Sequence, residues 1–286
     1  MQLTFDVFSG RTNPSWRLPP IISRQVFDLI NDIGFLRHLT SQEFPVRLGY
    51  RGLQIVLPPE IVVKYRVPSW LNLPADAFDH VPLFKELLAI ARIMGFIGLD
   101  EFLRLARLII ELLQKRASSS APPSASAPPR PLAGPCPFEM LPFDPAPWND
   151  PQFKPTNNCY AYAANKRALY SDKPQPGTAT GTTCAFPPTG PDVRAAAKRD
   201  GAHDVGDCFP DREAPRLLVA LVIWPGEDYH WYRKHPDCWG HKPGATDARN
   251  FDDSHVMITN PETCNRGPYT EFHGYMLMPK SQKVAA

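Results

Sequence analysis

The sequence predicts an α+β protein made of two folded units that are joined by a tether. Residues 117–133 read ASSSAPPSASAPPRPLA, a composition that cannot bury a core and favours extended chain. Helical spacing and strand-like alternation both occur on each side of this segment. All six cysteines and six of the eight histidines lie on its carboxyl side. We therefore expect an α+β domain at 1–116, a linker at 117–133, and a domain at 134–286 that carries the chemistry.

The elements expected in the amino-terminal domain begin with an alternating strand over residues 3–7. A helix is expected at 20–32, followed by strands at 47–57 and 61–65 that Pro58 and Pro59 separate. Apolar residues at spacings of three and four predict helices at 81–94 and 99–115. The last helix could present a leucine-rich face to a protein partner, although such faces usually pack into their own domain. No catalytic constellation is visible in this domain, and its role stays open.

The carboxyl-terminal domain is expected to place a helix first and an antiparallel sheet afterwards. The segment PTNNCYAYAANKRALY, residues 155–170, is helical by composition, and Thr156, Asn157 or Asn158 can cap it. A short helix is expected at 192–198. Strand signals then follow at 217–224, 229–234, 238–242, 256–259 and 272–278.

Composition and charge exclude several classes of protein. The 34 prolines indicate much loop structure. A net charge of +2 with scattered basic residues makes nucleic acid an unexpected partner. The most apolar stretch, residues 83–113, is interrupted by charged residues, so we expect no membrane span.

The cysteines and the amino terminus point to different compartments. Six cysteines are an even number, as a disulfide framework requires. The start MQLTFDVFSGR does not read as a secretory signal, which favours a reducing compartment. The expected location is therefore cytoplasmic, or exported without a classical signal, as for an effector.

Cys159 is the candidate nucleophile. It follows Asn158 at the expected first turn of a helix, where free N–H groups and the helix dipole lower the pKa of a thiol. The same N–H groups could hold an oxyanion. Alternatively, Cys159 is a small buried residue among Tyr160, Ala161 and Ala163.

His230 is the expected base, with His241 as the residue that orients it. If the chain turns at His235 and Pro236, His230 faces His241 and Tyr232 faces Trp239 on one side of a hairpin. The second imidazole could then fix the tautomer of the first. An alternative base is His255 with Asn260 as its orienting amide, and the sequence leaves both possibilities open.

The order of Cys at a helix start, a buried strand, and then His at the head of the next strand resembles the papain-like NlpC/P60 and CHAP peptidases and amidases. The resemblance covers residues 157–242 and implies Cys159 as nucleophile, His230 as base and His241 as orienter. This chain has Asn158 and Tyr160 where those families usually place Asp and a small residue. The resemblance implies a papain-like fold and a peptide or peptidoglycan-like amide substrate, with Asn158, Tyr160, Trp231 and Trp239 in its groove.

Other uses of the cysteines remain open. Cys208, Cys238, His241 and Cys264 could form a zinc site, but no pair has the Cys-x-x-Cys or His-x-x-x-His spacing, so no metal or other cofactor is expected. Disulfides among the five cysteines other than Cys159 could instead hold a loop-rich domain together.

Two functions follow from these residues. The main hypothesis is a cysteine peptidase or amidase, a thiol hydrolase or transferase that acts on an amide bond through an acyl-enzyme. The alternative is a non-enzymatic, cysteine-rich binding or matrix protein stabilised by disulfides or a metal.

Overall fold

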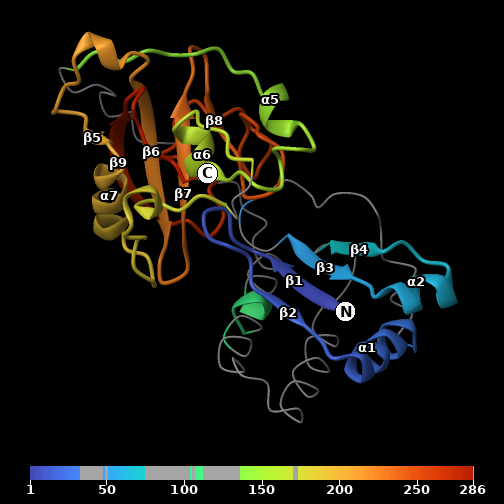
Figure 1. Cartoon of the computed structure of the whole chain (residues 1–286). Coiled ribbons are helices and arrows are strands. Elements are labelled where there is room, and N and C mark those ends of the chain that lie inside the picture. Colours follow the sequence, from blue (N-terminus) through green and yellow to red (C-terminus); the bar gives the residue numbers. More distant parts are fainter. Residues whose placement is uncertain are drawn as a thin grey trace. The chain divides into compact units, whose positions relative to one another are not determined.

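A computed structural model describes residues 1–32, 48, 51–74, 104, 107–111, 136–169 and 173–285. The chain divides into two compact units, which Figure 1 shows in the colours of the sequence. The first unit comprises Met1–Val7, Asn13–Pro45 and Tyr50–Pro123. The second comprises Ser124–Ala286 together with two short stretches from the amino-terminal part, Phe8–Thr12 and Val46–Gly49. The expected linker at 117–133 lies outside the described residues.

The first unit contains an antiparallel sheet in the order β2-β1-β3-β4. Its strands are β1 (Gln2–Asp6), β2 (Ser15–Arg17), β3 (Gly52–Val56) and β4 (Trp70–Pro74), and its helices are α1 (Pro20–Asp32) and α2 (Pro59–Tyr65). Alternation along the strands buries Leu3, Leu53 and Leu73. Helix α1 buries Ile22, Val26 and Ile30, which follow one another at a spacing of four. The bounds expected for this helix are confirmed.

The strand expected at 61–65 is wrong, because this segment is helix α2. Its run Ile61-Val62-Val63 is typical of a strand. The helix is favoured by proline in its first turn, by Glu60 near its start and by Lys64 near its end. The helices expected at 81–94 and 99–115 fall outside the described residues, except that residue 104 and residues 107–111 are helical.

The second unit is built on an antiparallel sheet in the order β5-β9-β6-β7-β8. Its strands are β5 (His203–Asp204), β6 (Leu217–Trp224), β7 (Asp228–Lys234), β8 (Trp239–His241) and β9 (Glu271–Met278). The helices are α5 (Ala146–Asn149), α6 (Cys159–Ala163) and α7 (Gly190–Arg199), with short 3-10 turns at Thr178–Thr180 and Asp211–Glu213. Both units therefore combine helices with antiparallel sheets, and the α+β class is confirmed.

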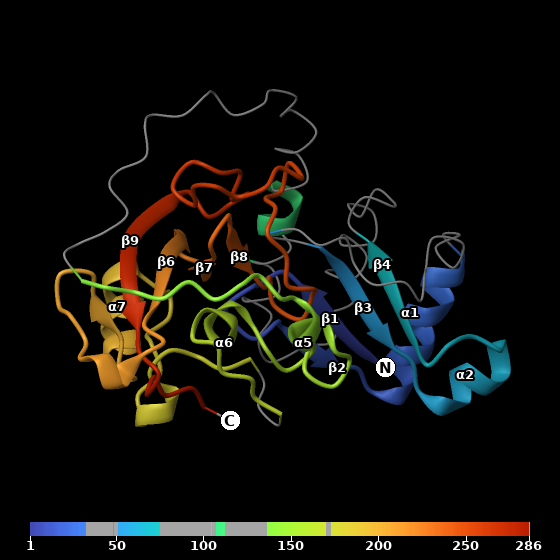
Figure 2. The ribbon, with the colours of Figure 1, turned by 90° about the horizontal axis from the view of Figure 1, so that it is seen from above.

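Helices α6 and α7 lie on the same side of this sheet, and much of the connection from β8 to β9 lies on the other side (Figure 2). Alternate residues of β6, Val219, Leu221 and Ile223, pack with Val193 and Ala197 of α7. β6 is buried along its whole length because the sheet is covered on both faces. In the described part of the chain, no helix is long and apolar enough to cross a membrane.

Two expectations for the second unit are wrong in detail. The strand expected at 256–259 is an isolated bridge between Phe251 and Met257. The helix expected within 155–170 has only the five residues of α6. It ends at Ala164 because Asn165 takes a left-handed conformation at φ +54°.

Candidate functional site

Cys159 opens helix α6, as the sequence predicts. The helix begins here because the Asn158 side chain accepts the Ala161 N–H at 3.1 Å and thereby caps the first turn. The thiol, however, points into the core that α6 shares with α7 and the sheet, and it is fully buried. Burial, together with the nearby Asp228 carboxylate, raises the pKa of the Cys159 thiol well above its ordinary value. Cys159 is therefore a neutral, buried thiol, and the prediction of a thiolate is wrong.

The structure does not bring Cys159 and His230 together. Tyr229 and Trp231 of β7 belong to the apolar core around Cys159. His230 lies between them in the strand, and successive side chains of a strand point to opposite faces. The thiol and the imidazole are consequently separated by the sheet.

His230 and His241 do contact each other, as predicted. His230 Nε2 lies 2.8 Å from His241 Nδ1. The predicted register is wrong by two residues, since His241 pairs with Tyr232 and Trp239 pairs with Lys234. A shift of two residues keeps every side chain on its face, so the two imidazoles meet as diagonal neighbours.

Arg249 determines the tautomer of this histidine pair. Its Nε lies 3.0 Å from His241 Nε2, and Phe251 O lies 3.1 Å from the same nitrogen. A guanidinium can only donate, so we assign Nε2 as the acceptor and place the His241 proton on Nδ1. His241 then donates to His230. Burial, followed by the positive charge of Arg249, lowers the pKa of His241 well below its usual range, so its imidazole is neutral.

The hydrogen bonds continue from His230 to a carboxylate. His230 Nδ1 lies 2.9 Å from Ser9 Oγ, Ser9 Oγ lies 2.7 Å from Tyr269 Oη, and Tyr269 donates to Asp228 Oδ2 at 2.6 Å. Asp228 accepts only, so every proton in the chain points from the arginine toward the aspartate. We call this set the buried relay: Arg249, His241, His230, Ser9, Tyr269 and Asp228.

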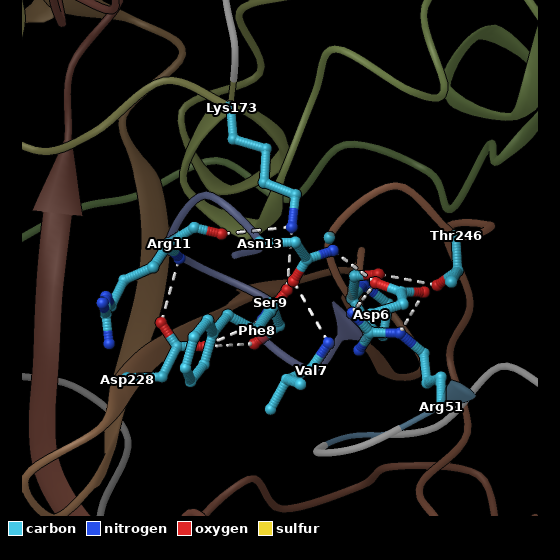
Figure 3. A network of polar contacts seen from close by, with 12 residues as sticks. Asp6, Val7, Phe8, Ser9, Arg11, Asn13, Arg51, Lys173, Asp228 and Thr246 are labelled. Carbon is cyan, nitrogen blue, oxygen red and sulfur yellow. Dashed lines mark hydrogen bonds and ion pairs between the residues drawn. The ribbon is translucent and has the colours of Figure 1, made fainter. Parts of the chain in front are cut away.

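The buried relay joins distant parts of the sequence within the second unit. Asp228 accepts the backbone N–H groups of Ser9 at 2.8 Å, Gly10 at 3.1 Å and Arg11 at 3.0 Å (Figure 3). Lys173 Nζ donates to Phe8 O at 2.9 Å from the other side (Figure 3). All six relay residues are at most 3% exposed. The relay is closed to a substrate and stabilises the fold, since each buried polar group finds a partner.

The residues expected to line a substrate groove lie in the core. Tyr160, Trp231 and Trp239 are fully buried. Asn158 is fully buried as well, and its Nδ2 donates to Gly10 O and Pro174 O. Asn158 thereby connects α6 to the Phe8–Thr12 segment.

The alternative base His255 is exposed, in a tight turn at φ +60°. Its ring lies 5.6 Å from that of Phe251. Asn260, its expected orienter, accepts the Glu262 N–H at 2.9 Å through its side chain. Neither residue is placed against Cys159 in any described contact.

The cysteines divide into one disulfide and four thiols. Cys136 and Cys208 are joined by a disulfide across 72 residues. The free thiols are Cys159, Cys184, Cys238 and Cys264, of which Cys159 and Cys238 are buried. No group of three or more His, Cys, Asp or Glu side chains that could hold a metal occurs among the described residues, so the residues proposed for zinc do not converge there.

Sequence reasoning missed Ser9, Tyr269, Asp228 and Arg249. Ser9 and Tyr269 lie far along the chain from the histidines, and no local pattern links them. Asp228 and Arg249 offered a signal, because they are charged residues that stand two positions before His230 and eight after His241.

Comparison with known proteins finds a relative among the matrix proteins of the shell. The chain is 43% identical over 135 residues to insoluble matrix shell protein 1 of Ruditapes philippinarum, which covers 47% of this chain and 87% of that protein. No family model matches the sequence, and no solved structure matches the fold. The NlpC/P60 or CHAP resemblance therefore stays a prediction.

The predicted hydrolase function is wrong. The relative is named as a matrix protein of the shell, and not as a peptidase or amidase. The thiol hydrolase hypothesis fails with it, including the amide substrate that it required, and the non-enzymatic alternative fits better. The physical reason for the error is that the helix-start cysteine and the strand-head histidine have other roles here, in the core and in the buried relay.

Proposed function

Since the chain belongs to the family of insoluble matrix shell protein 1, we propose that it is an exported, non-enzymatic structural protein of an extracellular matrix. The kinship, which extends over most of the length of that relative, is the observation that carries the proposal.

The Cys136–Cys208 disulfide supports an extracellular location. Disulfides persist in oxidising environments and are rare in reducing compartments. Residue 136 is also held by its neighbourhood, because Glu139 forms an ion pair with Arg216 and the Glu139 N–H donates to Arg216 O at 2.9 Å. The bond thus ties the first residue of the described stretch 136–169 to the loop before β6.

The interior of the second unit supports a structural role. Its one helix-start thiol is buried with a raised pKa, and its histidine pair is enclosed in a directed hydrogen-bond chain. A buried, fully bonded polar network specifies a unique packing. These residues make the unit rigid and leave none of these side chains open for chemistry.

Fractionation of the source tissue tests the proposal. An antibody against the chain should detect it in the extracellular material that resists extraction with buffer and detergent, and non-reducing peptide mapping should recover the Cys136–Cys208 peptide pair. A cytosolic enzyme serves as the fractionation control. Detection of the chain only in the cytosolic fraction, with both cysteines reduced, would overturn the proposal.

Alkylation of the native protein tests the absence of an activated thiol. We expect iodoacetamide at mildly acidic pH to leave Cys159 unmodified, and denaturant to make it reactive. Cys184, which is partly exposed, is the internal comparison. Rapid, selective labelling of native Cys159 would contradict the structural role.

A further inference from the structure

A groove of about 790 Å³ opens on the second unit, beside its carboxyl-terminal segment. We call it the basic groove; the residues that matter for its chemistry are Phe153, Asn165, Lys166, Arg167, Gln282 and Lys283. Arg167 is held in place at its edge, because its guanidinium lies over the Phe153 ring at 4.4 Å and donates to Pro147 O at 3.2 Å. The groove therefore presents at least one cation in a fixed position.

The positive charge of this groove has no carboxylate partner among the described residues. Within the described part of the chain, Lys166, Arg167 and Lys283 form no ion pair with a carboxylate, and no acidic residue lines the groove. Several cations elsewhere in the second unit do have carboxylate partners, as Lys198 has Asp204 and Arg216 has Glu139. A concave surface with charge of one sign attracts ligands of the other sign.

A buried cation, Arg233, contacts a residue that lines the groove. Arg233 is 2% exposed, and its Nη1 donates to Asn165 Oδ1 at 2.9 Å and to Tyr162 O at 2.7 Å. Among the residues described, its Nε has no hydrogen-bond partner and no carboxylate pairs with it. A buried charge without a counter-charge is costly. An anion bound beside Asn165 would offset that cost.

Gln282, which lines the groove, has a buried acceptor atom without a donor among the described residues. Gln282 is 3% exposed, and its Nε2 donates to Tyr160 Oη at 2.9 Å. Tyr160 in turn donates to Asp200 at 2.6 Å, which fixes the orientation of the amide. Gln282 Oε1 is left with no hydrogen-bond partner in the described chain. A ligand hydroxyl group can supply the missing donor.

From these contacts we propose that the basic groove binds an acidic polysaccharide. Such a polymer carries carboxylate groups and hydroxyl donors on the same ring, matching the unpaired cations and the Gln282 acceptor. An acidic peptide supplies its carboxylates on flexible side chains without neighbouring hydroxyl groups, so it fits less well. This inference goes beyond the matrix role proposed above and does not depend on it.

Binding of the full-length chain to alginate oligosaccharides, measured by calorimetry at low salt, tests the proposal. Dextran is the neutral probe and poly-aspartate the acidic peptide probe. The variant Lys166→Gln/Arg167→Gln/Lys283→Gln removes the three exposed cations. The variant Arg212→Gln/Lys234→Gln/Lys280→Gln removes the same charge at positions outside the groove lining. Thermal unfolding of both variants checks that they fold.

We expect the native chain to bind alginate and not dextran, and the groove variant to lose about tenfold or more in affinity because several exposed ion pairs are lost together. The control variant should lose less than about threefold. Equal losses in the two variants would overturn the groove as the site. Absence of alginate binding, or tighter binding of poly-aspartate, would overturn the polysaccharide as ligand, while the fractionation result would stand independently.

Discussion

At the scale of single residues, the second unit depends on buried polar side chains whose protons are ordered. Arg249 at one end of the buried relay only donates, and Asp228 at the other end only accepts. Between them, His241, His230 and Ser9 each donate in one direction, so both imidazoles must remain neutral. Loss of one member leaves a buried neighbour without its partner, which costs more than the bond itself contributes.

Ser9→Ala tests the relay at its centre. The substitution removes the acceptor of His230 Nδ1–H and the donor to Tyr269. We expect the free energy of unfolding to fall by about 1–3 kcal/mol, as measured by urea denaturation. Ser254→Ala, at an exposed serine, should change it by less than about 0.5 kcal/mol. Similar effects of the two variants would mean that the relay contributes nothing to stability.

The neutral histidines also predict a pH dependence. The pKa of His241 lies well below 6.5, and burial lowers that of His235 to about 4. In the unfolded chain both groups bind protons near pH 6.5, so stability is complete above that pH and falls as the pH drops toward the folded pKa. Between pH 6.5 and 5.5 we expect these two histidines to lower the stability by about 1 kcal/mol each.

Urea denaturation across that window measures the effect, because carboxylates with ordinary or lowered pKa values stay ionised there. His241→Gln should remove its share of the slope, about 1 kcal/mol over this window. His255→Gln, at an exposed histidine outside the relay, is the control. A pH-independent stability over this window would show that neither His235 nor His241 resists protonation.

At the scale of elements, the short helix α6 is held more by tertiary bonds than by its own length. Five residues cannot sustain a helix alone. Asn158 caps it and also donates to Gly10 O at 2.7 Å and Pro174 O at 2.8 Å. The capping residue thus joins the helix to two other segments of the second unit.

Asn158→Ala and Thr189→Ala compare a buried cap with an exposed one. Thr189 caps α7 by accepting the Asp192 N–H at 3.3 Å. We expect about 1 kcal/mol of destabilisation from Thr189→Ala and about 3 kcal/mol or more from Asn158→Ala, which also leaves buried carbonyl groups unbonded. Thermal unfolding measures both. If Asn158→Ala destabilises the protein no more than Thr189→Ala does, the hydrogen bonds from Asn158 Nδ2 contribute nothing beyond the helix cap.

At the scale of the whole molecule, the second unit is not a continuous stretch of chain. It includes Phe8–Thr12, whose backbone is bound by Asp228 and by Lys173. Gly10 is needed at this contact, since a Cβ there would lie 2.5 Å from Tyr229 O. A domain boundary placed in the linker therefore leaves Phe8–Thr12, which belongs to the second unit, on the wrong side.

A fragment of residues 134–286 is consequently expected to be several kcal/mol less stable than the same unit in the full chain, because it loses several buried hydrogen bonds of about 1 kcal/mol each. Limited proteolysis in urea, followed by mass spectrometry of the second unit, measures the difference. Asp228→Asn is the coupling control: it should destabilise the full chain by about 2 kcal/mol or more and the fragment by much less. Equal effects in both would mean that the Phe8–Thr12 segment is dispensable.

The sequence by itself determined the α+β class, helix α1, strands β6, β7 and β9, and the meeting of His230 with His241. Each of these rests on local periodicity, which sets the face a side chain occupies within its own element. Only the tertiary structure decided that Cys159 and His230 lie on opposite faces of the sheet and that Ser9 completes the histidine pair. It also decided that Tyr160, Trp231 and Trp239 fill the core. Such contacts depend on which elements cover each face and on segments distant in the chain, and no local pattern encodes them.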